Sequence, residues 1–112
     1  MLTLPELQQK AIEMEARIHP ILKSIGVDTA RQSDETKILG LHESATKLWV
    51  SVMGKKEQEE IDRRVASALI GVLLLAKHFN VENLEDAYLK RLEEVFEHNK
   101  KAADEILSKK IQ

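Results

Sequence analysis

Residues 41–54, LHESATKLWVSVMG, hold three side chains that could do chemistry: Glu43, Ser44 and Lys47. The stretch reads as the second half of an amphipathic helix that ends at Gly54. A helix of this kind often carries acids that bind a metal, yet a hydroxyl and an ammonium group stand here instead. Two hypotheses follow: a magnesium site with exchanged ligands, or a surface that never bound a metal.

The composition excludes several other kinds of chemistry. The chain has 112 residues and no cysteine, which excludes disulfides, thiolate metal sites and cysteine nucleophiles. Its four glycines form no phosphate-binding loop, and no serine lies in a glycine-flanked nucleophile elbow. The formal net charge is −2 and the few aromatic residues lie outside basic runs, so no nucleic-acid binding is expected.

The chain is expected to lie in the cytoplasm. Its longest uncharged stretch, residues 65–76, is much shorter than the roughly 20 residues that a membrane-spanning helix needs. The first residues, MLTLPELQQK, lack the basic region, apolar core and cleavage site of a signal peptide.

The sequence signals at its two ends predict the first helix of the fold that positions Glu43, Ser44 and Lys47. Thr3 and Glu6 predict a capping box, in which each residue satisfies a free amide of the other. Pro20 predicts a kink or an end near His19, because proline has no N–H and its ring clashes with the preceding turn. Gly26 is expected to terminate the helix.

Three further helices are predicted, which makes the chain all-α. Ser33 is expected to cap the second helix and Gly54 to close it. The third is expected from about Glu57 to Phe79, ended by Asn80, and Asn83 is expected to cap the fourth. The apolar stripe of the second helix is predicted at Ile38, Leu41, Ala45, Leu48 and Val52.

The third helix differs from the others because it is apolar on all sides after Arg64, in the run VASALIGVLLLA. A helix without a polar face must be covered all round, and three short helices can hardly do that alone. Its small residues also allow a neighbouring helix to approach closely. A homo-oligomer with this helix at its centre is therefore expected.

Three passages resemble the MazG-like family, the all-α nucleoside triphosphate pyrophosphohydrolases. They are LTLPELQQKAIEME, ILGLHESATKLWVSVMG and RRVASALIGVLLLAKHFNVENLEDAYLKRLEE, which together span nearly the whole chain in order. The resemblance implies a single MazG-like domain over residues 1–112. It implies a four-helix subunit that forms an intertwined helical-bundle dimer or tetramer.

The resemblance also assigns a site, and most of that site is replaced. Active members hydrolyse a nucleoside triphosphate to the monophosphate and pyrophosphate, using Mg²⁺ held by the acids of EExxE and ExxD motifs. Glu43 matches the first acid, Ser44 and Lys47 stand at the next two, and Arg64 and Ser67 stand at the acids of ExxD. One acid beside two cations cannot supply the oxygen ligands that Mg²⁺ requires, so no metal or cofactor and no catalysis are expected.

Two interpretations of the replaced site stay open. The five residues together form a candidate cleft that binds a nucleotide, a phosphate or a protein partner without a metal. Lysine would act there as a point charge and arginine as a bidentate fork. In the other interpretation Glu43 neutralises one or both cations in a structural ion pair, and the cleft is vestigial.

An enzyme remains the alternative. Glu59, Glu60 and Asp62 form a literal ExxD five residues earlier, which suggests a divergent Mg-dependent (d)NTP pyrophosphohydrolase that uses Glu43 with these three acids. Five helical residues shift a side chain by about 7.5 Å, so this register would misalign the apolar run. A plain helical interaction module without a small ligand is the third hypothesis.

Overall fold

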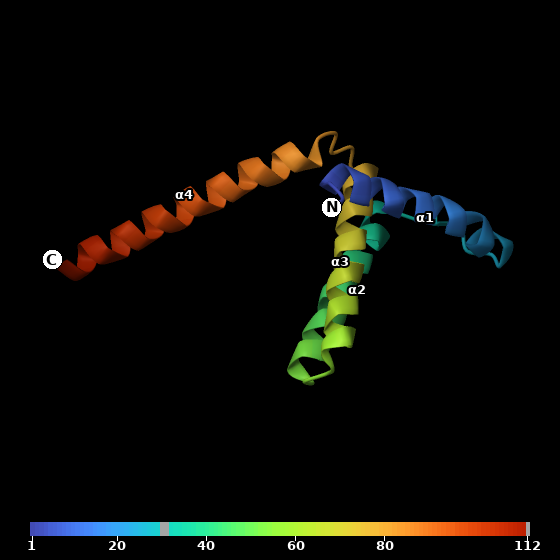
Figure 1. Cartoon of the computed structure of the whole chain (residues 1–112), viewed down its shortest axis with the longest axis horizontal. Coiled ribbons are helices and arrows are strands. Elements are labelled where there is room, and N and C mark those ends of the chain that lie inside the picture. Colours follow the sequence, from blue (N-terminus) through green and yellow to red (C-terminus); the bar gives the residue numbers. More distant parts are fainter. Residues whose placement is uncertain (30–31, 112) are drawn as a thin grey trace. The chain divides into compact units, whose positions relative to one another are not determined.

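The computed structural model describes residues 1–29 and 32–111, and the predicted all-α class is confirmed. The described residues form α1 (Leu4–Ser24), α2 (Asp34–Met53), α3 (Gln58–His78) and α4 (Leu84–Ile111), shown in Figure 1. The chain divides into two units, Met1–Glu82 with the first three helices and Asn83–Gln112 with the fourth. The single domain expected over residues 1–112 stays a prediction.

Both ends of α1 follow from local sequence. The Thr3 hydroxyl accepts a hydrogen bond from the Glu6 amide at 3.3 Å, and the Glu6 carboxylate accepts one from the Thr3 amide, so the capping box is confirmed. At the other end Gly26 has a φ of +87°, which only glycine adopts without strain. The Val27 amide donates back to the Leu22 carbonyl at 2.9 Å, which closes the helix as a Schellman motif.

Of the kink or end expected near His19, the end is wrong, because α1 continues through Pro20 to Ser24, and the kink stays a prediction. Proline removes one backbone bond, to the carbonyl of Ala16. Only one more turn follows the proline, and the Schellman bonds hold that turn. The Ser24 hydroxyl also donates to the Ile21 carbonyl at 2.6 Å. A proline so close to a well-closed helix end is therefore tolerated.

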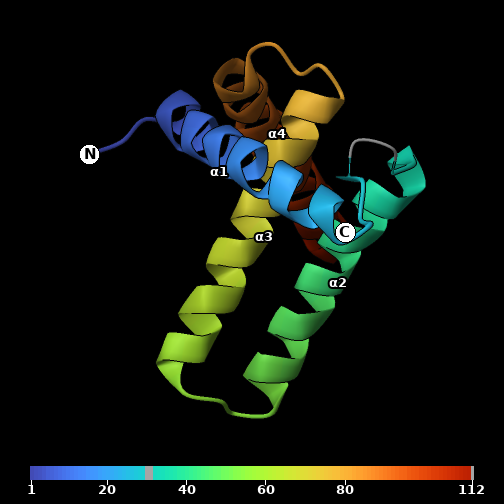
Figure 2. The ribbon, with the colours of Figure 1, turned by 90° about the vertical axis from the view of Figure 1, so that its right-hand side faces the viewer.

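Helices α2 and α3 form an antiparallel hairpin, seen side by side in Figure 2. Ser33 caps α2 by accepting from the Thr36 amide at 3.2 Å, and Gly54 ends it, as predicted. The less exposed positions recur in steps of three and four and mark the seam between the two helices. They are Leu41, Ser44, Leu48 and Ser51 on α2, and Ile61, Arg64, Ala68, Gly71 and Leu75 on α3.

Within the single chain, only part of the predicted stripe of α2 lies in the seam. Leu41 and Leu48 lie in the seam, but Ile38 and Val52 are 51% and 48% exposed. Ser51 lies in the seam instead and is buried. A small side chain lets two helices approach closely, so the seam selects for size as well as for apolarity. The larger apolar residues are left on the outer face of α2.

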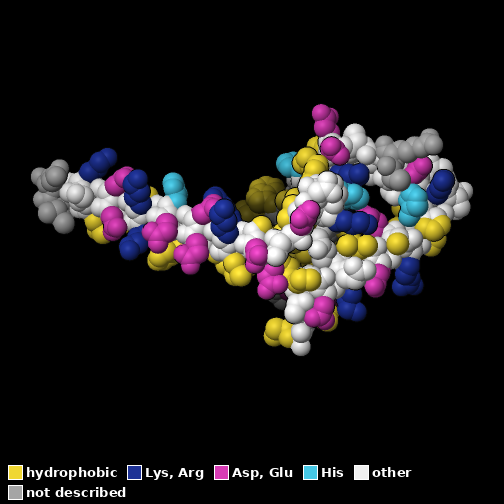
Figure 3. Space-filling model, turned by 90° about the horizontal axis from the view of Figure 1, so that it is seen from above, with side chains coloured by type: hydrophobic (Ala, Val, Ile, Leu, Met, Phe, Trp, Pro, Cys, Tyr) yellow, Lys and Arg dark blue, Asp and Glu magenta, His cyan; other side chains and the backbone are white. Residues whose placement is uncertain are grey.

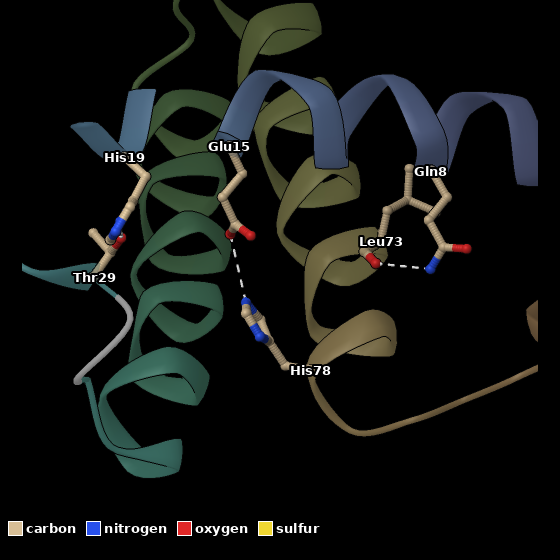
Figure 4. A network of polar contacts seen from close by, with 6 residues as sticks. All are labelled: Gln8, Glu15, His19, Thr29, Leu73 and His78. Carbon is tan, nitrogen blue, oxygen red and sulfur yellow. Dashed lines mark hydrogen bonds and ion pairs between the residues drawn. The ribbon is translucent and has the colours of Figure 1, made fainter. Parts of the chain in front are cut away.

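Helix α1 packs against α3, and these two helices carry the buried hydrophobic side chains of the described chain. Leu73 is 2% exposed, and Ala11 and Ala76 are also buried. The side-chain amide of Gln8 donates to the backbone carbonyl of Leu73 at 3.0 Å. This polar contact fixes the register of α1 along α3 (Figure 4).

Two predictions about the loop from α3 to α4 are confirmed: Asn80 ends α3 and Asn83 caps α4. Asn80 ends α3 with a φ of +57°, a left-handed conformation that asparagine tolerates better than most residues. The Val81 amide donates to the Ala76 carbonyl at 2.9 Å. Asn83 then caps α4 by accepting from the Asp86 amide at 3.1 Å.

Helix α4, taken by itself, has hydrophobic side chains exposed between acidic and basic ones (Figure 3). They recur at helical spacing, at Tyr88, Leu92, Val95, Phe96 and Ile106. On the polar side Arg91 pairs with Glu94 at 3.0 Å. None of the helices in the described part of the chain combines the length and apolarity needed to cross a membrane.

Candidate functional site

The five candidate ligand-binding residues lie on the α2–α3 hairpin, in two different environments. Glu43 and Lys47 on α2 and Ser67 on α3 are exposed, whereas Ser44 and Arg64 are half-buried in the seam. Resemblance placed all five in one cleft. In the single chain, two of them face the neighbouring helix and three face outward.

The Ser44 hydroxyl donates its proton to a backbone carbonyl of its own helix. Its Oγ donates to the Gly40 carbonyl at 3.2 Å, a bond that serine often makes inside helices. The hydroxyl retains acceptor capacity, but its one proton is committed. Ser44 therefore needs to break this bond before it can donate to a phosphate.

Arg64 is held by an acid on its own helix. Its Nη2 lies 3.6 Å from Oε1 of Glu60, one turn earlier, and both side chains are 31% exposed. Glu60, rather than Glu43, is thus the acid that neutralises this cation. The Arg64 Nε is buried and has no hydrogen-bond partner among the described residues. A guanidinium with an unused buried donor is not fully satisfied by the chain.

The acids of the alternative enzyme hypothesis do not gather within one chain. Glu43 and Glu59 are exposed, and Asp62 accepts from the Gln58 side chain at 2.8 Å. Glu60 is occupied by Arg64. Within residues 1–29 and 32–111 no three His, Asp or Glu side chains are grouped closely enough to hold a metal ion.

A second location was missed by sequence reasoning: a hollow of about 580 Å³ between α1, α2 and α3. Its polar lining residues include His19 on α1, Lys37 on α2 and Lys77 and His78 on α3. Glu15 stands four residues before His19 in the sequence, but in the structure it pairs with His78 on the other helix. The packing of α1 on α3 brings Glu15 to His78 across more than sixty positions, so no local signal would have revealed this partner.

Polar contacts fix both histidines of this hollow, and Figure 4 shows those with Glu15 and Thr29. The His78 Nε2 lies 3.5 Å from Oε2 of Glu15, an ion pair when the imidazole is protonated. The His19 Nδ1 shares a hydrogen bond of 2.8 Å with the Thr29 hydroxyl, and its Nε2 lies 4.0 Å from the Asp28 carboxylate. The rings are thus held by α3–α1 and loop–α1 contacts.

Comparison with known proteins leaves the resemblance without independent support. No protein-family model matches the chain, and neither the curated proteins nor the solved structures contain a match to it.

Proposed function

We propose that this protein is a non-catalytic, MazG-related helical subunit that assembles with copies of itself and binds an anion on the α2–α3 hairpin. The anion is a nucleotide or another phosphate. The observation that carries this proposal is the Arg64 guanidinium, which is half-buried and has one acid partner in the described chain, Glu60 at 3.6 Å from its Nη2. A phosphate offers several oxygens to such a fork.

Lys47 supports the same interpretation. Its ammonium group is exposed on α2 and makes no ion pair or hydrogen bond within the described residues. A lysine supplies a point charge that reaches a phosphate without a fixed geometry. Glu60 opposes binding, because a phosphate that approaches Arg64 must compete with this carboxylate. The expected affinity is therefore modest.

The absence of catalysis is proposed from the residue types at the matched positions. Four of the five positions that carry acids in active members hold Ser44, Lys47, Arg64 and Ser67. Serine and the two cations cannot replace carboxylates around Mg²⁺. A second version of this proposal is that the same face of the α2–α3 hairpin binds a protein partner.

Assembly is proposed from the exposed apolar face of α3. Val65 and Leu69 are 51% and 44% exposed, and Ile70 and Val72 are exposed as well. Contiguous apolar surface on a folded chain commonly marks a protein–protein interface. A dimer or tetramer that buries this face would also bring hairpins of different copies together. Leu69→Glu is expected to dissociate the oligomer in light scattering, whereas the exposed, polar Lys56→Glu is expected to leave it intact.

The binding proposal is tested by calorimetric titration with ATP, dCTP and inorganic pyrophosphate, each with and without Mg²⁺. Binding that does not require Mg²⁺ and weakens about tenfold or more in Arg64→Gln and Lys47→Gln supports it, since charged hydrogen bonds contribute about 1.5–3 kcal/mol. Lys55→Gln, in the exposed loop, is the matched control. No heat at millimolar ligand in either condition overturns it.

The enzyme alternative has its own measurement. Pyrophosphate release is assayed across the common NTPs and dNTPs with Mg²⁺ or Mn²⁺. Turnover that Glu43→Gln abolishes would establish the divergent enzyme that uses Glu43, Glu59, Glu60 and Asp62, and would refute the non-catalytic proposal. Absence of turnover in a preparation that binds nucleotide supports it.

A further inference from the structure

Lys37 is a cation in a place where helix stability does not explain it. It occupies the fourth position of α2, close to the N-terminal end where the helix dipole is positive. Its side chain is half-buried and lines the hollow between α1, α2 and α3. The ammonium group makes no ion pair or hydrogen bond within the described residues. A half-buried, unpaired cation points to an anionic partner that lies outside the chain.

The other charged groups of the hollow add to this imbalance. Lys77 also lines the hollow and is likewise unpaired among the residues described. Glu15 is the one acid of the described lining, and His78 lies beside it at 3.5 Å. Asp28, close to His19, is not among the lining residues. Two lysines, the half-buried Lys37 and the exposed Lys77, thus line a hollow whose one described carboxylate already has a partner.

The remaining lining is aliphatic. Met14 and Ile18 come from α1, Leu41 from α2, and Leu74 and Leu75 from α3. No aromatic residue lines the described hollow, so it offers no ring on which a base or an aromatic group could stack. Flexible aliphatic walls accommodate a hydrocarbon chain by dispersion and by removing it from water.

Two glycines leave space in the hollow. A Cβ atom at Gly40 would meet no atom within 4 Å, and one at Gly71 would meet the Leu41 Cδ1 at 3.7 Å, an ordinary contact. Neither position needs glycine for its backbone conformation, since the described residues with positive φ lie elsewhere. The glycines therefore enlarge the hollow without being required by the helices.

We infer that this hollow is a binding site for a small aliphatic anion, with its hydrocarbon chain among the aliphatic walls and its carboxylate or phosphate beside Lys37 and Lys77. The volume of about 580 Å³ lies within the range of small-ligand pockets, roughly 300–1,000 Å³. The site is independent of the nucleotide proposal, because it uses neither Lys47 nor Arg64.

The test is a calorimetric titration of the full chain with four probes of the same tail. Octanoate and octyl phosphate carry an anionic head, octan-1-ol is neutral and octyltrimethylammonium is cationic. Binding of either anion, about tenfold or more tighter than the alcohol and with no binding of the cation, supports the site and identifies its preferred head group. Equal binding of anion and cation, or no binding of either anion, overturns it.

Variants separate this site from the one on the hairpin. Gly40→Leu is expected to fill the hollow and abolish octanoate binding, whereas Gly40→Ala is expected to reduce it much less. Lys37→Gln is expected to weaken the anions about tenfold while leaving octan-1-ol unchanged, and it tests the site even if the leucine variant misfolds. Lys47→Gln is the control that should retain octanoate binding. Loss of octanoate binding in Lys47→Gln, or its persistence in folded Gly40→Leu, overturns the inference.

A second copy of the chain is the competing occupant of this hollow. Light scattering of Gly40→Leu and of the octanoate-saturated protein distinguishes the two. An unchanged oligomeric state in both samples supports the small-ligand site. Dissociation in both samples would show that another copy occupies the hollow, and would overturn the inference.

Discussion

Arg64 and Lys37 lie towards opposite ends of the α2–α3 hairpin and differ in whether an acid pairs with them. Towards the loop that joins the helices, the seam contains Arg64, and Glu60 on the same helix neutralises it. At the opposite end, where α1 packs on α3, the helices border a hollow that Lys37 lines. No acid in the described chain pairs with Lys37. Arg64 thus has an acid partner on its own helix, whereas Lys37 has none within the described chain.

This difference teaches that a cation in an unexpected place is informative only after its partners are known. From the sequence, Arg64 was the conspicuous residue because it replaces an expected acid. Lys37 was unremarkable among the polar residues of a helix start. With partners assigned, Arg64 has a structural explanation in part, whereas Lys37 has none within the described chain.

The largest expected effect concerns the packing of α1 on α3, at the end of the hairpin that borders the hollow. Leu73→Ala removes the side chain that is 2% exposed, and should lower the free energy of unfolding by about 2–5 kcal/mol in urea titrations. Leu69→Ala, at a position 44% exposed, is the matched control within the same helix and should cost much less in the dissociated chain. Equal losses in the two variants would mean that α1 does not pack on α3 as described.

A smaller effect is expected from the polar contact between the same two helices. Gln8→Ala should lower the free energy of unfolding by about 1 kcal/mol, because it removes the side-chain donor to the Leu73 carbonyl. The adjacent Gln9 is exposed and bonds only to Glu13 on its own helix, at 3.5 Å. Gln9→Ala should therefore change stability very little, and a loss as large as that of Gln8→Ala would refute this role of Gln8.

The smallest effects address the two cations directly. Glu60→Gln should lower the free energy of unfolding by less than about 1 kcal/mol, because the pair that it breaks is partly solvated. Lys37→Gln should leave stability unchanged or raise it by a few tenths of a kcal/mol, since it removes a positive charge near a helix N-terminus. Thermal unfolding of both variants at low and high salt measures these signs. A clear destabilisation by Lys37→Gln would show that the chain itself uses this charge.

The same Glu60 variant sharpens the binding proposal. Removing the competing carboxylate is expected to tighten nucleotide or pyrophosphate binding several-fold, while stability falls slightly. Calorimetry on Glu60→Gln beside Glu59→Gln, an exposed neighbour, measures this. Weaker binding in Glu60→Gln would mean that Glu60 orients Arg64 for the ligand and does not compete with it.

The helix ends were predictable because their signals are local. Thr3, Gly26, Ser33, Asn80 and Asn83 each act on backbone groups within a few residues, so the sequence contains both partners of every cap. Pro20 does not end the helix, because the cost of a proline depends on how well the following turn is closed. The closing bonds of Gly26 and Val27 decide this.

The seam and the hollow were not predictable in the same way. Hydrophobic spacing alone favoured Ile38 and Val52 as inward residues of α2, but close helix approach placed the small Ser44 and Ser51 inward. The contacts of His78 with Glu15 and of Gln8 with Leu73 join residues more than sixty positions apart. Nothing local to either residue announces such a partner. The proposed anion site on the hairpin stays a prediction from resemblance and from the contacts of Arg64.

Pro20 sets the last turn of α1 apart from the turns before it, because one backbone hydrogen bond is missing there. The turns before Pro20 include the Gln8 contact and the buried Ala11, whereas the turn after it ends at Ser24 and carries the exposed Ile21. With that backbone bond missing, the last turn should exchange its amide hydrogens well before the rest of the helix. Such opening would leave the α1 wall of the hollow in place, because Met14, Ile18 and His19 all precede Pro20.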